Sequence, residues 1–133
     1  MNLTNLNQKI ILQTGIFGVF MGISTTLGWC QEKEIYILIV MIIATILYLN
    51  KQLNSQILLH SIIIGLSWGF DCSLIQVIFF ETYTTNNPIV FSEIISISRN
   101  YPKIVLILLG SFFGLMSGLI MFSFIKLAEV IKN

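Results

Sequence analysis

Three side chains that could carry a proton or an ion lie on one stripe of an otherwise apolar segment. They are His60, Ser67 and Asp71, within residues 57–80. At 3.6 residues per turn they fall within about 20° of one line, and His60 and Asp71 lie roughly 16 Å apart along the axis. They cannot touch, but Ser67 lies between them, which is the layout of a water-assisted proton path. An ionisable group at membrane depth costs several kcal/mol, with estimates from about 3 to more than 10.

Asp71 can also be interpreted as a structural clasp. Burial raises the pKa of a carboxyl group, so a neutral Asp71 could hydrogen-bond to a hydroxyl of another helix. Ser24, Thr25 and Thr26 are predicted at a comparable depth. Interhelical hydrogen bonds of this kind contribute well under ~2 kcal/mol each, which is enough to set a helix register. Both interpretations stay open, and Gln13 and Gln76 are expected to form similar interhelical bonds.

No metal, cofactor or catalytic centre is predicted. The single histidine has no acidic or thiol neighbour at ligand spacing. Cys30 and Cys72 are expected at different depths, as packed small side chains, and two cysteines make no disulfide framework. There is no glycine-rich phosphate loop and no nucleophile beside a base. We therefore expect a non-enzymatic protein without a cofactor, and a net charge of +1 gives no sign of a nucleic-acid partner.

The elements that must position these residues are apolar segments long enough to cross a bilayer. The 133-residue chain is 56% hydrophobic and 10% charged, whereas soluble domains carry about 25% charge. Since about 20 apolar residues cross the hydrocarbon core, the sequence predicts an all-α polytopic membrane protein with a single domain, 1–133. Its four spans are expected as two helical hairpins at about residues 10–30, 35–50, 57–80 and 104–125. A fully buried soluble bundle is the alternative.

Glycines recur at every fourth position in three of these spans. This spacing lines one side of a helix with small residues, where a neighbouring backbone can approach closely. Packing within the chain is the preferred interpretation, and oligomerisation is the alternative. The second span has no such face and is expected at the lipid-facing perimeter. The predicted helix-packing residues are Gly18, Gly22, Gly65, Gly69, Gly110, Gly114 and Gly118.

The first and third spans resemble each other at a shift of 47 residues. The shift pairs Gly18 with Gly65 and places Ser24 opposite Asp71. Because both spans cross in the same direction, a true repeat would be parallel rather than inverted. Chance similarity among glycine-containing apolar helices is the alternative.

Residues 81–103 form a longer connection with structure of its own. Asn86-Asn87-Pro88 predicts a helix start, with asparagine as the N-cap and proline at the first helical position. We expect an amphipathic helix in the membrane interface at about residues 88–99, ended by Pro102. A surface loop that touches lipid is the alternative.

Orientation is weakly specified by the basic residues. Four lysines on the side of the termini face three basic residues on the other side, which favours cytoplasmic termini. The first group comprises Lys9, Lys51, Lys126 and Lys132, and the second Lys33, Arg99 and Lys103.

The order of these features resembles a family of small four-span bacterial membrane proteins of unknown function, abundant in the Bacteroidota. The resemblance covers nearly the whole chain and implies an inner-membrane location without implying an activity. Small multidrug resistance exporters are similar in size and span number, but their essential carboxylate lies in the first span, so Asp71 cannot be equated with it. The family features are Gly15 to Gly22, Ile35 to Leu49, Tyr83 with Asn87-Pro88, Phe91 to Arg99 and Gly110 to Gly118.

Two functions are compatible with this inventory. The preferred one is a non-enzymatic interaction or assembly subunit in the lipid bilayer, which packs through its glycine faces with further copies or with a larger complex. The alternative is a small proton- or ion-coupled transporter or channel-like element that uses Asp71, with Ser67 and His60 lining the route.

Overall fold

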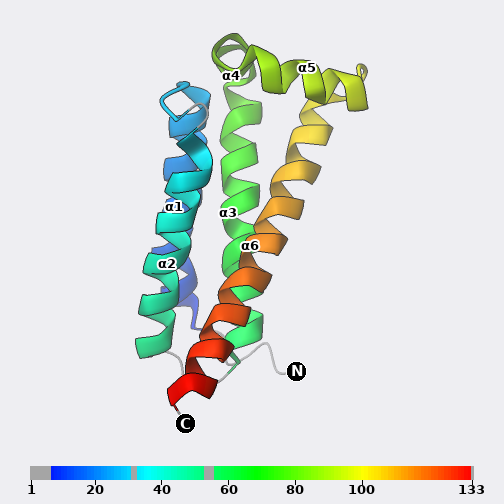
Figure 1. Ribbon diagram of the computed structural model, residues 1–133. Coiled ribbons are helices and arrows are strands. Elements are labelled where there is room, and N and C mark those ends of the chain that lie inside the picture. The colour runs from blue at the N-terminus through cyan, green and yellow to red at the C-terminus, as the bar shows by residue number, and fades with distance from the viewer. Residues whose placement is uncertain (1–6, 31–32, 53–55, 133) are drawn as a thin grey trace.

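The computed structural model describes residues 7–30, 33–52 and 56–132, and these form helices with short connections (Figure 1). No strand occurs in these ranges, which confirms the all-α class. Four helices are long and apolar enough to cross a membrane, as predicted: α1, α2, α3 and α6. The six helices are α1 (Gln8–Thr26), α2 (Glu34–Gln52), α3 (Ile57–Ile78), α4 (Phe80–Asn86), α5 (Pro88–Ile97) and α6 (Pro102–Lys132).

Helix α3 is the centre of the bundle. It makes its most extensive contacts with α6 and the next most extensive with α1, whereas α1 and α2 touch at few points. Two equivalent hairpins are therefore not observed, because α1 packs on α3 rather than on α2. Helix α1 begins and α6 ends at the same end of the bundle, and α5 lies crosswise at the other end (Figure 1).

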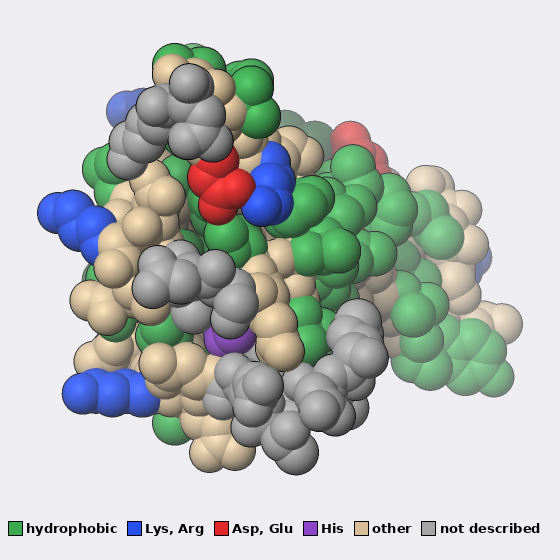
Figure 2. Space-filling model, turned by 90° about the horizontal axis from the view of Figure 1, so that it is seen from below, with side chains coloured by type: hydrophobic (Ala, Val, Ile, Leu, Met, Phe, Trp, Pro, Cys, Tyr) green, Lys and Arg blue, Asp and Glu red, His purple; other side chains and the backbone are tan. Residues whose placement is uncertain are grey.

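The outer surface of the bundle is largely apolar, and several polar side chains lie in its interior. The buried side chains include His60, Ser61 and Ser73, each at most 1% exposed, while large apolar side chains such as Leu12 are 77% exposed. Seen from the end that carries the termini, basic side chains lie around the rim and hydrophobic side chains extend along the flank (Figure 2). Since soluble monomers rarely expose large contiguous apolar patches, this distribution is consistent with integration into a membrane.

Helix α1 ends at Thr26, four residues before the predicted boundary. Gly28 adopts a left-handed backbone conformation with φ +68°. The amide of Trp29 donates to the Ser24 carbonyl at 3.0 Å, and the amide of Gly28 donates to the Thr25 carbonyl at 3.0 Å. This pair of bonds is the Schellman arrangement that terminates helices at glycine.

The connection between α3 and α6 contains one helix more than predicted. The backbone breaks at Phe79, and α4 follows before Asn87. Pro88 occupies the start of α5 as expected, but the Asn87 side chain makes no capping bond. Pro102 was expected to end the interfacial helix, and this is wrong: α5 ends at Ile97, and Pro102 opens α6.

Helices α4 and α5 pack as a small unit against the top of α6. Phe80 and Phe91 meet edge-to-face at 5.7 Å between ring centroids. The ammonium group of Lys103 lies 5.1 Å from the centre of the Phe80 ring. Tyr83 and Ile94 are buried between the helices, and burial raises the pKa of the Tyr83 phenol. These contacts fix the angle at which the chain turns from α3 into α6.

Helix α6 continues beyond residue 125, where the fourth span was predicted to end, as far as Lys132. The extension is built from good helix-forming residues. The Lys126 ammonium pairs with the Glu129 carboxylate at 2.6 Å, at the i, i+3 spacing that supports an exposed helix. The apolar stretch therefore ends near residue 125 as predicted, but the helix continues beyond it.

Candidate functional site

One face of α3 is in backbone contact with α6. A Cβ atom added to Gly69 would overlap the carbonyl oxygen of Gly110, and one added to Gly65 would overlap that of Gly114. A Cβ on Gly118 would lie 2.6 Å from the carbonyl oxygen of Ser61. Each of these distances is shorter than real Cβ contacts allow. The two helices can therefore approach this closely only because glycines face each other.

A second face of α3 is in backbone contact with α1. A Cβ on Gly18 would lie 2.7 Å from the Trp68 Cα atom, and one on Gly22 would lie 3.0 Å from the Cys72 Cα atom. All seven glycines selected from the sequence thus lie against another helix of the same chain. Their contacts leave none of these glycine faces open toward a second molecule.

Asp71 and Ser67 lie on the flank of α3 that faces α1, beside Gly15. A Cβ on Gly15 would lie 3.9 Å from Asp71 Oδ2 and 4.0 Å from Ser67 Oγ, which is ordinary contact, so Gly15 has room where Gly18 has none. Asp71 is half-buried. Within the described ranges its carboxyl group makes no hydrogen bond and no ion pair.

The predicted clasp between Asp71 and the hydroxyls of Ser24 to Thr26 is not formed. Gly18 lies against Trp68 and Gly22 against Cys72, an offset of 50 residues (68 − 18 and 72 − 22) rather than 47. Ser24 is therefore about one turn beyond Asp71.

Side-chain amides tie the end of α1 to the end of α3 and to α4 instead. Gln76 Nε2 donates to the Thr25 hydroxyl at 2.9 Å. Asn86 Nδ2 donates to the Thr26 carbonyl at 2.9 Å, and Asn87 Nδ2 donates to the Thr25 carbonyl at 2.9 Å. The expectation for Gln76 is thus confirmed. The role of Asn87 was missed because its place before Pro88 suggested a local cap.

Gln13 also forms the expected bond between helices. Its side-chain oxygen accepts a hydrogen bond from the Tyr48 hydroxyl at 2.6 Å, across the boundary between α1 and α2. This bond is exposed, unlike those at the other end of α1.

His60 is buried, with both ring nitrogens engaged. The amide of Asn7 donates to Nε2 at 3.0 Å, and Nδ1 lies 3.0 Å from the Gln56 carbonyl oxygen. A backbone amide can only donate, so Nε2 carries no proton and Nδ1–H donates to Gln56: the ring is the neutral tautomer. Ser67 donates to the Ile64 carbonyl at 2.9 Å. Within the described ranges, no chain of hydrogen bonds links His60, Ser67 and Asp71 into a continuous path.

Trp68 is a buried residue that the sequence interpretation missed. Its indole Nε1 donates to the Thr14 carbonyl at 2.7 Å, and its ring meets Phe17 edge-to-face at 5.8 Å. A buried indole needs a hydrogen-bond acceptor, and this need could have marked Trp68 in the sequence as a residue that contacts another helix. The acceptor is a backbone carbonyl on another helix, so it could not be identified without the helix register.

The described residues contain no group of three or more His, Cys, Asp or Glu side chains that could hold a metal ion. Cys30 and Cys72 are both free thiols.

No protein-family model, no curated protein and no solved structure matches this chain. The resemblance to the four-span bacterial family therefore stays a prediction.

Proposed function

We propose that this chain is an integral protein of the bacterial inner membrane that acts as a non-enzymatic interaction or assembly subunit. In this proposal α1, α2, α3 and α6 cross the bilayer, α5 lies in the interface, and the termini are cytoplasmic. The observation that carries the proposal is the carboxyl group of Asp71, which lies within a span and has no hydrogen-bond or ion-pair partner among the described residues.

A half-buried carboxyl group without a partner is costly at this depth. Charged groups within membrane spans pair with one another or with backbone carbonyls, or face a water-filled cavity. Asp71 has no such pairing among the described residues, and Gly15 leaves space beside it. A membrane helix of another molecule that lies beside Asp71 would supply the missing donor.

The composition of the spans favours a different polypeptide over a second copy. The apolar interiors of the four spans contain no lysine or arginine, and their single histidine is bound within the chain. The glycine faces are also used internally. A larger complex whose partner presents a lysine, arginine or side-chain amide to Asp71 is thus better supported than a glycine-packed homo-oligomer.

Crosslinking in native membranes tests this proposal. We expect the wild-type chain to give a discrete crosslinked complex, Asp71→Leu to lose it, and Asp71→Asn to retain part of it because an amide still hydrogen-bonds. Ser67→Ala, one turn away, is the matched control and should retain the complex. A wild-type chain that is monomeric in mild detergent and crosslinks to nothing would contradict the proposal.

The alternative is a small proton- or ion-coupled transporter or channel-like element. The proximity of Asp71 and Ser67 beside Gly15 favours this function. His60, the third residue of the predicted proton route, is instead hydrogen-bonded to the backbone through both ring nitrogens. Proton flux into liposomes distinguishes the two functions. A flux that is lost in Asp71→Asn, with the bundle still folded, would support transport.

A further inference from the structure

A hydrogen bond fastens the start of α1 to α3. The backbone amide of Asn7 donates to His60 Nε2 at 3.0 Å. Asn7 is also the N-cap of α1, and its carbonyl accepts from the amides of Ile10 and Ile11 at 3.0 and 3.2 Å. The bond to His60 therefore holds the residue on which the first turn of α1 is built.

The imidazole can make this bond only while it is neutral. Nε2 accepts from Asn7, and Nδ1–H donates to the Gln56 carbonyl at 3.0 Å. Protonation adds a hydrogen to Nε2, and a protonated ring nitrogen can only donate. Two donors, the Asn7 amide and Nε2–H, would then face each other. The bond from Nδ1–H is compatible with both charge states, so the loss falls on the contact with α1.

No carboxylate of the described helices is placed to stabilise a charged His60 ring. Helix α1 has no acidic residue. The acids of α2 and α3 lie far from this end: Glu34 begins α2, and Asp71 is roughly 16 Å beyond His60 along α3. The acid of α6, Glu129, pairs with Lys126.

The basic side chains at this end are exposed and come from three helices. They are Lys9 of α1, Lys51 of α2 and Lys126 of α6. The Tyr48 phenol of α2 donates to Gln13, and residues 1–6 and 53–55 add no acidic or basic side chain. Because His60 is 1% exposed and a buried charge without a partner is costly, a protonated ring is stabilised by moving toward water. The start of α3 at Ile57 is only about one turn away.

We propose that the hydrogen bond from Asn7 to His60 is a proton-sensitive latch. The neutral ring holds Asn7 and keeps the start of α1 against α3, whereas the imidazolium releases Asn7 and the first turn of α1 frays. Histidine ordinarily changes charge between about pH 5 and pH 8, so acidification on the side of the termini loosens this end of α1. The latch is independent of Asp71 and of the assembly function proposed above.

NMR of the isotope-labelled chain in lipid nanodiscs tests the latch, because the chain has a single histidine. The ring nitrogens show the charge of His60, and hydrogen exchange of the Ile10 and Ile11 amides shows the state of the first turn. Exchange is expressed as a protection factor, which removes the intrinsic pH dependence of amide exchange. As the ring becomes charged, we expect these factors to fall about fivefold, the effect of one lost hydrogen bond. The Val105 amide, bonded to the Tyr101 carbonyl in α6, should keep its protection.

Two pairs of variants isolate the two partners. His60→Gln retains an oxygen acceptor that does not titrate, so protection should stay high at both pH values, and His60→Leu should be poorly protected at both. Asn7→Pro removes the amide donor, and proline adopts the φ of −78° found at this position, so the pH dependence should vanish. Asn7→Ala is its matched control, because it removes only the side-chain cap and should keep the pH dependence.

Three results would overturn the latch. The first is a His60 ring that stays neutral down to pH 5. The second is unchanged protection of Ile10 and Ile11 while the ring becomes charged. The third is a fall in His60→Gln equal to that in the wild type, which would show that another group titrates.

Discussion

Helices α3 and α6 pack closely against each other, whereas α1 and α2, which are similarly apolar, do not. At the first, glycines of both helices bring backbone against backbone. At the second, branched and aromatic side chains keep the helices apart, the described residues form one exposed hydrogen bond between them, and a groove remains. In a lipid environment no hydrophobic force drives helices together, so close packing depends on small residues. Small side chains rather than apolar ones decide which helices associate closely.

The contact between α1 and α3 is intermediate between these two. It combines two close glycines with hydrogen bonds from Trp68 and Gln76. We therefore expect substitutions to lower the free energy of unfolding most between α3 and α6, less between α1 and α3, and least between α1 and α2.

The largest effect is expected from Gly69→Ala at the boundary of α3 and α6. The new methyl group would overlap the Gly110 carbonyl, and because that atom is backbone the helices must separate. We expect the free energy of unfolding to fall by about 3 kcal/mol, the upper end of overpacking costs, measured by denaturant titration in detergent. Ala44→Leu, on the exposed side of α2, should change it by less than about 0.5 kcal/mol. Equal effects of the two substitutions would contradict the difference between the boundaries.

A smaller effect is expected from Gly18→Ala in α1. Its methyl group would lie 2.7 Å from the Trp68 Cα atom, so α1 must shift away from α3. We expect a loss of about 1–2 kcal/mol in the free energy of unfolding. Gly15→Ala is the control three residues away: its methyl group meets only ordinary contacts at 3.9 Å or more, and it should be neutral or slightly stabilising. A comparable loss in both variants would show that helix flexibility, not the contact with Trp68, is being measured.

Asn87→Leu tests the amide ties. The substitution removes the donor to the Thr25 and Tyr83 carbonyls in a buried setting. We expect a loss of about 1 kcal/mol in unfolding free energy, with faster hydrogen exchange at the amides that end α1. Asn100→Leu, an exposed asparagine beyond α5, should leave both measurements unchanged. The interpretation fails if α1 exchanges at the wild-type rate in Asn87→Leu.

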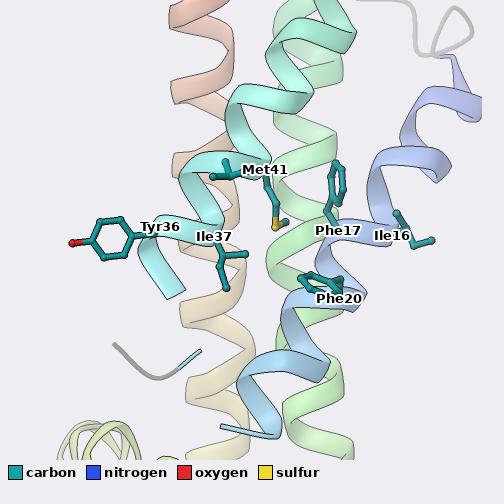
Figure 3. Close-up of a pocket in the computed structure, with 7 residues that line it drawn as sticks. Ile16, Phe17, Phe20, Tyr36, Ile37 and Met41 are labelled. Carbon is teal, nitrogen blue, oxygen red and sulfur yellow. The ribbon is translucent and has the colours of Figure 1, made fainter. Parts of the chain in front are cut away.

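The smallest effect is expected from Tyr48→Phe. It deletes the hydrogen bond from Tyr48 to Gln13, which is exposed. Helices α1 and α2 make few other contacts with each other. Interhelical hydrogen bonds in membranes average about 0.6 kcal/mol, so the unfolding free energy should fall by no more than this amount. Tyr36→Phe, whose hydroxyl points away from the bundle (Figure 3), should have no effect on it. A loss above about 1.5 kcal/mol would mean that α2 depends on this bond far more than its contacts indicate.

The sequence by itself determined the elements and their faces. The lengths of the apolar segments predicted four spans, the glycine spacing predicted the residues that lie against neighbouring helices, and Pro88 predicted the start of α5. These features follow from helical geometry and chain composition, which are local properties.

Only the tertiary structure decided which helix each face meets and at what height. The register between α1 and α3 differs from the sequence match by three residues, which is nearly one turn, and this difference leaves Asp71 without its expected partner. The tertiary structure also engages His60 Nε2 with the amide of Asn7 and brings Asn87 to the Thr25 carbonyl. Register depends on how surfaces from distant parts of the chain interlock, and apolar helices of similar composition contain no local signal for that fit.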